Sequence, residues 1–250
     1  MDDSDGAPAR SSEHTFEDLQ AWYDTPLGRL TRRAILRVLD DLLPYLFGYH
    51  GAVIGAFLPW AEVLEASKIN HRFSIARGSG RIADAAVRAD YEALPLASES
   101  LDLAVVLHGL EVVTDPAALI DEVERVLLPE GNLIVVGFNP FSLWGVPHMA
   151  GRIGKRRATG RLLSQERVLR EFDRAGFALQ SRQSVLFRPP LQQARLLGRL
   201  AFMEPLGVQL WPLGGGVYIM HGRKRVATLT QIPLRWRSQW QRAWGGSPAG

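Results

Sequence analysis

The sequence contains no cysteine. This absence excludes disulfide bonds, metal sites with thiolate ligands and a cysteine nucleophile, and it fits a reducing compartment. The six histidines show no metal-ligand spacing, and neither a G-x-S-x-G nor a P-loop pattern occurs. We therefore expect no bound metal, and no hydrolase or nucleoside triphosphatase chemistry of those two kinds.

A secretory signal and a membrane span are also missing. The first residues, MDDSDGAPARSSEH, are acidic and polar, so they lack the order of a signal peptide, and we expect residues 1–14 to be disordered. The stretch Gly131–Gly151 has no charged residue, but Asn139-Pro140 and Pro147 interrupt it. It is predicted to be a buried strand that runs into a loop, and the protein is expected to be cytoplasmic.

Acidic residues are scarce near the end of the chain. None follows Glu204, so residues 227–250 form a basic tail, in which Trp236, Trp240 and Trp244 recur every fourth position. On a helix these rings share one face, which is typical of segments that lie at a membrane interface, stack on single-stranded RNA or dock on the parent domain. A second basic run, Arg152–Arg161, follows an aromatic and apolar stretch and is either an acceptor- or membrane-binding lip or a solvated loop.

Strand and helix patterns alternate along the rest of the chain. Leu101–Leu107 is apolar on both faces, as in a strand covered by helices on each side, and Asp115 and Pro116 mark the start of the next helix. Ser164 is predicted to begin a later helix that ends at Gly176. The other expected elements are helices at 30–46 and 191–203, and strands at 52–58, 71–76, 132–138, 177–187 and 217–223. This order predicts an α/β fold with three layers and a mostly parallel sheet.

An ordered set of motifs fills Ala89–Gly137. It comprises an acid, L-P-L, S-x-D before an apolar strand, D-P at the head of a helix and R-V-L-x-P-x-G before the next strand. In these motifs the chain resembles the class I S-adenosylmethionine-dependent methyltransferases, in particular the branch with a type 11 domain. The resemblance implies a Rossmann-like seven-stranded sheet with only the last strand antiparallel, within a domain spanning 15–226 that carries an insertion at 188–216. It also implies S-adenosylmethionine as cofactor and a small or amphipathic acceptor. The basic run Arg152–Arg161 is compatible with an anionic acceptor.

The resemblance assigns roles to several residues. Asp90 matches the acid that accepts a hydrogen bond from the adenine amino group, and Tyr91 is expected against the ring. His108, with Glu111 just after it, follows the fourth strand and is expected to face the transferring methyl. In W-Y-D-T-P-L-G, Tyr23 and Thr25 match an N-terminal element that covers the cofactor. Each position also has a structural interpretation: a turn cap for Asp90, a packed histidine for His108, and a helix start for Tyr23 and Thr25.

No catalytic residue is assigned, because the sulfonium donor itself carries the reactive methyl group and the fold needs mainly to align the acceptor. For the same reason, no residue is assigned as a general base.

The stretch V-I-G-A-F-L-P-W departs from the family pattern. Gly55 keeps one glycine of the cofactor-binding turn, whereas Val53, Phe57 and Pro59 replace the acid and two further glycines. No acid occurs between Glu65 and Asp84 to hold the ribose hydroxyls, a loss of roughly 3 to 6 kcal/mol for two such hydrogen bonds. Two hypotheses follow: an enzyme with altered ribose contacts, or an inactive scaffold that binds a protein, a membrane surface or RNA through its basic segments.

Overall fold

The protein is described by a computed structural model that covers residues 19–55, 58–77, 87–144, 162–191 and 193–226. The N-terminal 14 residues, Phe57, the basic run Arg152–Arg161 and the tail 227–250 lie outside these ranges, so the predictions made for them stay predictions.

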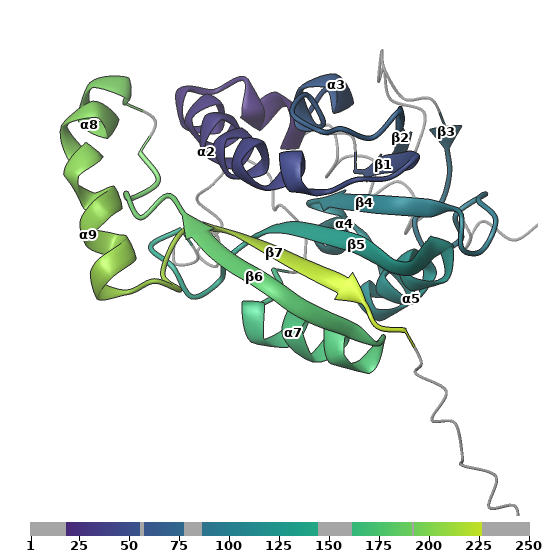
Figure 1. Cartoon of the computed structure of the whole chain (residues 1–250). Coiled ribbons are helices and arrows are strands. Elements are labelled where there is room, and N and C mark those ends of the chain that lie inside the picture. Colours follow the sequence, from purple (N-terminus) through teal and green to yellow (C-terminus); the bar gives the residue numbers. More distant parts are fainter. Residues whose placement is uncertain (1–18, 56–57, 78–86, 145–161, 192, 227–250) are drawn as a thin grey trace, which may run out of the picture.

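Seven strands form one sheet in the order β3-β2-β1-β4-β5-β7-β6 (Figure 1). The first five strands pair in parallel, and β7 runs antiparallel to both of its neighbours. The predicted fold class is therefore confirmed. The strands are β1 His50–Ile54, β2 His71–Ala76, β3 Val87–Arg88, β4 Leu101–Leu107, β5 Leu127–Phe138, β6 Phe177–Val185 and β7 Val217–Lys224.

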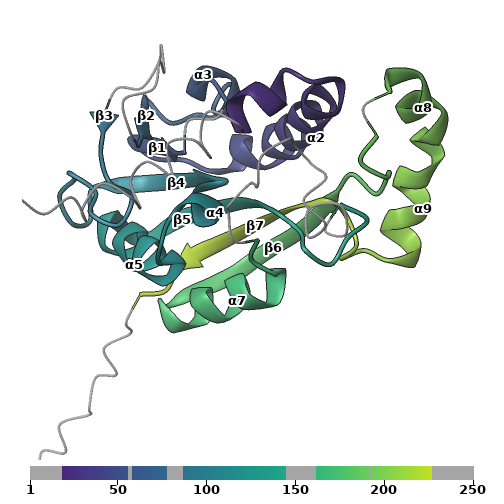
Figure 2. The ribbon, with the colours of Figure 1, turned by 180° about the vertical axis from the view of Figure 1, so that it is seen from behind.

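Helices cover both faces of this sheet. Figures 1 and 2 show α2 and α3 on one face and α5 and α7 on the other, which gives the expected three layers. The described helical segments are α2 Pro26–Leu42, η2 Leu43–Tyr45, α3 Trp60–Val63, α4 Gly109–Val112, α5 Pro116–Val126, α7 Gln165–Arg174, α8 Ala194–Arg199, η3 Leu200–Phe202 and α9 Met203–Leu210.

The caps predicted from sequence are present. The Asp115 side chain accepts a hydrogen bond from the Ala117 N–H at the start of α5, and the Ser164 side chain accepts one from Arg167 at the start of α7. Gly176 follows α7 with φ of 81°, in the left-handed region that glycine adopts without strain. Local side-chain chemistry therefore sets these helix ends.

Several predicted boundaries were wrong. The strand expected at 132–138 begins at Leu127, because Leu127 already pairs with Leu101, and the strand expected at 177–187 ends at Val185. The helix expected to reach residue 46 ends at Leu42 and is followed by η2.

The first long helix begins at Pro26 rather than residue 30, because Thr25 caps it. The first strand stops at Ile54 rather than at residue 58, because Gly55 turns the backbone with φ of 90°. The helix expected at 191–203 is instead three consecutive pieces, in which η3 separates α8 from α9.

Parallel pairing brings the carboxyl ends of the strands to one edge of the sheet. Gly55, Arg77, His108 and Asn139 directly follow β1, β2, β4 and β5, and Asp90 lies two residues after β3. Open sheets of this type bind ligands in the crevice outside these ends. The candidate site is built from this edge.

Candidate functional site

Gly55 forms the first part of the site, at the end of β1. Its φ of 90° requires a glycine or a strained residue, and its N–H donates to the Ile75 carbonyl at 3.2 Å across the β1–β2 pair. The backbone therefore leaves the sheet in a tight turn here. This is the one glycine of the family turn that the sequence retains.

Arg77 occupies the end of β2, where the family has an acid. Its Nη2 atom lies 3.4 Å from Oδ2 of Asp90, so the two side chains form an ion pair across the site. Nη1 of Arg77 is buried and has no hydrogen-bond partner among the described residues. The sequence showed that an acid was missing, but not that a cation reaches Asp90 from this position.

Asp90 is well placed to receive a further ligand. Its side chain is 49% exposed, and Oδ1 accepts a hydrogen bond from the Glu92 N–H at 3.2 Å. This local bond is the turn cap anticipated from sequence. Each carboxylate oxygen has two lone pairs, so the cap and the Arg77 pair leave acceptor capacity facing solvent.

Tyr91 does not present a ring face to the site. The side chain is completely buried, and its hydroxyl accepts a hydrogen bond from the Arg77 N–H at 3.1 Å. Burial raises the pKa of this phenol well above its usual value, while contacts with the backbone N–H groups of Arg77 and Gly55 act in the opposite direction. Tyr91 thus holds the ends of β1 and β2 together instead of contacting a ligand through an open face.

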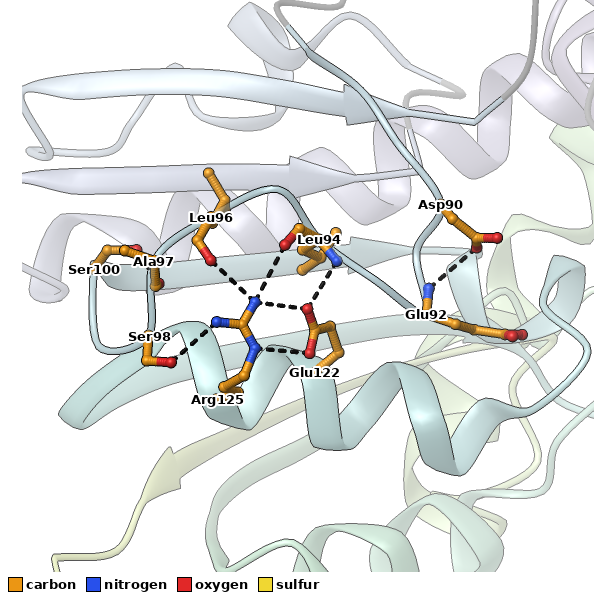
Figure 3. A network of polar contacts seen from close by, with 9 residues as sticks. All are labelled: Asp90, Glu92, Leu94, Leu96, Ala97, Ser98, Ser100, Glu122 and Arg125. Atoms are coloured by element: carbon orange, nitrogen blue, oxygen red, sulfur yellow. Dashed lines mark hydrogen bonds and ion pairs between the residues drawn. The ribbon is translucent and has the colours of Figure 1, made fainter.

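A network around Arg125 fixes the loop that follows Asp90 (Figure 3). The Arg125 guanidinium donates to the carbonyls of Leu94 and Leu96 and to the Ser98 hydroxyl, at 3.0 to 3.2 Å. It also pairs with Glu122, whose carboxylate accepts the Leu94 N–H at 2.8 Å. These hydrogen bonds hold the pKa of Glu122 below its usual value. The arginine of the R-V-L motif therefore has a structural role that sequence reasoning missed.

Glu92 attaches the same loop to the start of α5. Its Oε1 atom accepts the N–H groups of Thr114 and Asp115 at 2.9 and 3.0 Å. The Glu92 N–H also bonds to the Asp90 carboxylate, as Figure 3 shows. Asp90 therefore belongs to a loop that is anchored at two points, by Arg125 and by Glu92. The position of Asp90 is therefore set by residues far from it in sequence.

His108 lies at the end of β4, as predicted, in an enclosed polar cluster. Its φ is 51° and its ring is completely buried, stacked on Phe138 at 4.3 Å between centroids. Nε2 lies 2.6 Å from the Tyr23 hydroxyl, and Nδ1 lies 3.4 Å from Oε1 of Glu111. A neutral imidazole that donates from Nδ1 to Glu111 accepts the Tyr23 O–H at Nε2.

The two residues of the predicted N-terminal cover have different positions. Tyr23 is buried against His108, and burial, reinforced by the charge of Glu111, raises the pKa of its phenol. Thr25 instead caps α2: its hydroxyl accepts the Gly28 N–H at 3.0 Å and donates to the Trp22 carbonyl at 2.7 Å. The structure brings Tyr23, but not the Thr25 hydroxyl, into the cluster with His108.

Glu111 has one satisfied and one open oxygen. Oε1 accepts the Phe138 N–H at 2.7 Å, while Oε2 is buried without a hydrogen-bond partner in the described part of the chain. The buried Tyr218 hydroxyl is likewise without a partner there, and burial together with the Glu111 charge raises its pKa. Both side chains lie against Gly137: a Cβ atom there would come within 2.4 Å of the Tyr218 oxygen and 3.0 Å of Oε1 of Glu111, so a larger residue would displace them.

Aromatic rings enclose this polar cluster. Trp22 makes edge-to-face contacts with Tyr23, Phe138 and Trp144 at centroid distances of 5.1 to 6.1 Å. The Trp22 indole N–H is buried and forms no hydrogen bond with the described residues. The ends of β4 and β5 thus carry an apolar enclosure that contains several polar atoms with unused bonding capacity.

A comparison with protein families matches residues 55–135 to a methyltransferase domain. That segment begins at the glycine of the turn and includes Asp90, His108 and Arg125. The match and the sheet order together confirm the resemblance seen in the sequence: the chain contains a methyltransferase domain of the class I, S-adenosylmethionine-dependent type. S-adenosylmethionine is the cofactor of that class.

Two curated relatives extend this similarity. The chain is 36% identical over 140 residues to the uncharacterized protein YafS of Escherichia coli (strain K12), covering 56% of each chain. It is 30% identical over 182 residues to an uncharacterized protein of Mycobacterium tuberculosis, covering 68% of this chain and 61% of that protein. The matches therefore span less than two thirds of the length of these relatives.

Solved structures support the fold. An S-adenosylmethionine-dependent methyltransferase of Thermotoga maritima, described as a possible histamine N-methyltransferase, superposes with a TM-score of 0.62 at 21% identity, covering 87% of this chain and all of that one. A methyltransferase of Mesorhizobium loti gives a TM-score of 0.50 at 19% identity, covering 75% and 96%. Both similarities concern the fold.

Two further properties concern the described residues alone. No group of three or more histidine, aspartate or glutamate side chains in them is arranged to hold a metal ion. Within the same ranges, no helix has the length and apolar character needed to cross a membrane.

Proposed function

We propose that this protein transfers a methyl group from S-adenosylmethionine to a small-molecule acceptor at the carboxyl edge of its sheet. The observation that carries the proposal is the placement of Gly55, Arg77 and Asp90 at the ends of neighbouring parallel strands, held there by the buried Tyr91. When bound, the cofactor supplies an electrophilic methyl on a sulfonium. The chain's own task is to bind the donor, align the acceptor and exclude water.

The groups at the donor end fit this cofactor, with one departure from the family pattern. The half-exposed Asp90 carboxylate can accept the adenine amino group, as the resemblance implies, and the Gly55 turn brings backbone close without a side chain. In place of an acid, Arg77 offers Nη1, a buried donor that has no partner among the described residues and can donate to a ligand seated against it. A ribose hydroxyl oxygen accepts hydrogen bonds as well as donating them, so a guanidinium can replace a carboxylate if the hydroxyl acts as acceptor.

The groups at the acceptor end fit a molecule with both apolar and polar parts. Trp22 and Phe138 provide aromatic surface, while Oε2 of Glu111, which is buried without a partner among the described residues, can accept a hydrogen bond from a group that enters this enclosure. The Tyr23–His108–Glu111 chain of contacts fixes the positions of these groups and provides a path by which a proton can leave an acceptor hydroxyl or amine. We propose no specific base beyond this chain.

Isothermal titration calorimetry and thermal shift with S-adenosylmethionine and S-adenosylhomocysteine test the donor site. We expect saturable binding by the wild-type protein and by Asp121→Ala, which removes a 52%-exposed acid of α5 that pairs with Arg174. Asp90→Ala is expected to abolish or strongly weaken binding. If millimolar ligand gives neither heat nor a thermal shift, the enzyme hypothesis is wrong and the inactive-scaffold alternative remains.

A further inference from the structure

The segment between β6 and β7 stands at the same edge of the sheet as the site. Antiparallel pairing places Val217, the first residue of β7, opposite Phe138, the last residue of β5, so α8, η3 and α9 project from the carboxyl edge (Figures 1 and 2). Arg188 anchors the segment by donating to Glu204 at 2.9 Å and to the Leu197 carbonyl at 2.7 Å. The Leu197 side chain, on α8, is buried.

Most of this segment's apolar surface is exposed. No residue of η3 or α9 is buried, and Leu210 is 82% exposed. A helix that is apolar around much of its circumference ordinarily packs in a protein core or lies against lipid. The exposed large apolar side chains of the segment are Leu196, Phe202, Leu206, Val208, Leu210, Trp211 and Leu213.

Exposed arginines lie beside this apolar surface, and α8, η3 and α9 themselves carry no unpaired acid. Arg195 and Arg199 are exposed on α8 and form no ion pair with the described residues. The only acid of residues 193–213 is Glu204, which Arg188 neutralises. The neighbouring helix α2, which contacts α8, carries three more exposed arginines at four-residue spacing, Arg29, Arg33 and Arg37, and two exposed acids near its carboxyl end, Asp40 and Asp41.

We propose that the α8–α9 surface, residues 194–213, docks on an anionic lipid bilayer as a peripheral membrane contact. Exposed Leu, Phe and Trp side chains beside arginines are the composition of helices that lie in the headgroup region, and Trp prefers that interface. A second copy of the chain would bring the same arginines together, because a symmetric interface places each patch against itself. Charge therefore favours anionic lipid as the occupant.

The membrane contact is independent of methyl transfer but lies on the same side of the molecule. The Trp144 indole N–H donates to the Arg188 carbonyl at 2.7 Å, which joins the aromatic enclosure of the site to the base of the lipid-binding segment. Docking would thus turn the carboxyl edge of the sheet toward the bilayer.

Vesicle co-sedimentation of the full chain tests the proposal. We expect binding to equimolar phosphatidylglycerol–phosphatidylcholine vesicles, weakening with salt, and little binding to pure phosphatidylcholine. Replacing both Leu210 and Trp211 by serine, or both Arg195 and Arg199 by glutamate, should lower partitioning about tenfold or more. The matched control replaces Tyr45 and Phe47, which are 77% and 65% exposed before β1, by serine and should bind as the wild type does.

Several results would overturn the proposal. One is equal binding by all variants, which would assign lipid contact to another part of the chain. Another is no binding by the wild type to either vesicle. A third is a dimer in light scattering that the Leu210–Trp211 variant converts to a monomer, because that would make a second copy the occupant. Circular dichroism and thermal unfolding must match between each variant and the wild type, and cofactor titration reports separately on the donor site.

Discussion

The guanidinium of Arg77 lies 3.4 Å from the carboxylate of Asp90, across the carboxyl ends of β2 and β3. Related α/β sites hold a ribose hydroxyl with an acid after the second strand, and an arginine nearby accommodates an anionic ribose substituent. Here the arginine is the residue that follows β2. The pair therefore places a donor where an acceptor is usual, while Asp90 keeps the arginine oriented.

Substitutions of Arg77 and Asp90 should distinguish the contact with the ribose from the contact with the adenine. Asp90→Ala removes the acceptor for the adenine amino group and the partner of Arg77, and we expect S-adenosylhomocysteine to bind roughly 10- to 150-fold more weakly, the usual size of a hydrogen bond to a charged group. Arg77→Ala removes the ribose donor and the ion-pair partner of Asp90 but leaves the acceptor for the adenine amino group, and about tenfold weaker binding is expected. Titration calorimetry measures both. Unchanged affinity in Asp90→Ala would show that the adenine lies elsewhere.

Arg125→Ala should loosen the loop that carries Asp90. The variant loses hydrogen bonds to Leu94, Leu96 and Ser98, and we expect the free energy of unfolding to fall by about 2 kcal/mol. Amide hydrogen exchange in residues 94–100 should accelerate, and cofactor affinity should drop with it. Arg125→Lys should restore little, because one ammonium cannot reach Glu122 and both carbonyls together.

The matched control for this variant is Arg174→Ala. Arg174 also pairs with two acids, Asp121 and Glu171, but it lies 46% exposed on the surface. A loss below about 1 kcal/mol is expected there, as is usual for exposed ion pairs. Equal losses in urea unfolding for the two variants would contradict a special role for Arg125.

The fold was largely predictable because its signals are local. The apolar run of β4, the Asp115 and Ser164 caps and the Gly176 terminator each act within a few residues of chain, and each is present as predicted. Some predicted boundaries were wrong because a capping or turn residue, and not the hydrophobic pattern, determined the end of the element. Thr25 and Pro26 started α2 four residues earlier than the hydrophobic pattern indicated.

The contacts of the site were less predictable because they join distant residues. Tyr23 and His108 are 85 positions apart, and the open Tyr218 hydroxyl comes from a strand inserted between β5 and β6. Position at a strand end located His108 correctly, but no sequence signal indicated that its ring is sealed from solvent. The strand before Arg77 was predicted with the correct bounds, 71–76, but no local signal showed that the Arg77 guanidinium reaches Asp90.

Glu111→Ala should destabilise the fold more than Glu111→Gln. Alanine leaves the Phe138 N–H without its 2.7 Å acceptor, and we expect a loss of about 2 to 3 kcal/mol in the free energy of unfolding. Glutamine keeps an acceptor oxygen, so its loss should stay below about 1 kcal/mol. Urea unfolding measures both. If glutamine is as damaging as alanine, the negative charge rather than the hydrogen bond stabilises this edge.

His221 should make stability fall in mildly acidic solution. It lies on β7, 6% exposed, with Nε2 at 2.9 Å from Oδ1 of Asn132. Burial, with a smaller effect of the Arg223 charge, lowers its pKa to about 4. Above the unfolded value of about 6.5 the ring is neutral in both states and contributes no pH dependence.

Between about pH 6.5 and pH 4 the unfolded chain binds a proton at His221 while the folded chain does not, so the free energy of unfolding decreases as the pH falls. At about 1.4 kcal/mol per pKa unit the total loss is about 3 kcal/mol, complete below pH 4. Urea titrations across this range should give a shallower slope for His221→Gln, which cannot titrate. Parallel slopes for the two proteins would mean that other groups govern the acid response.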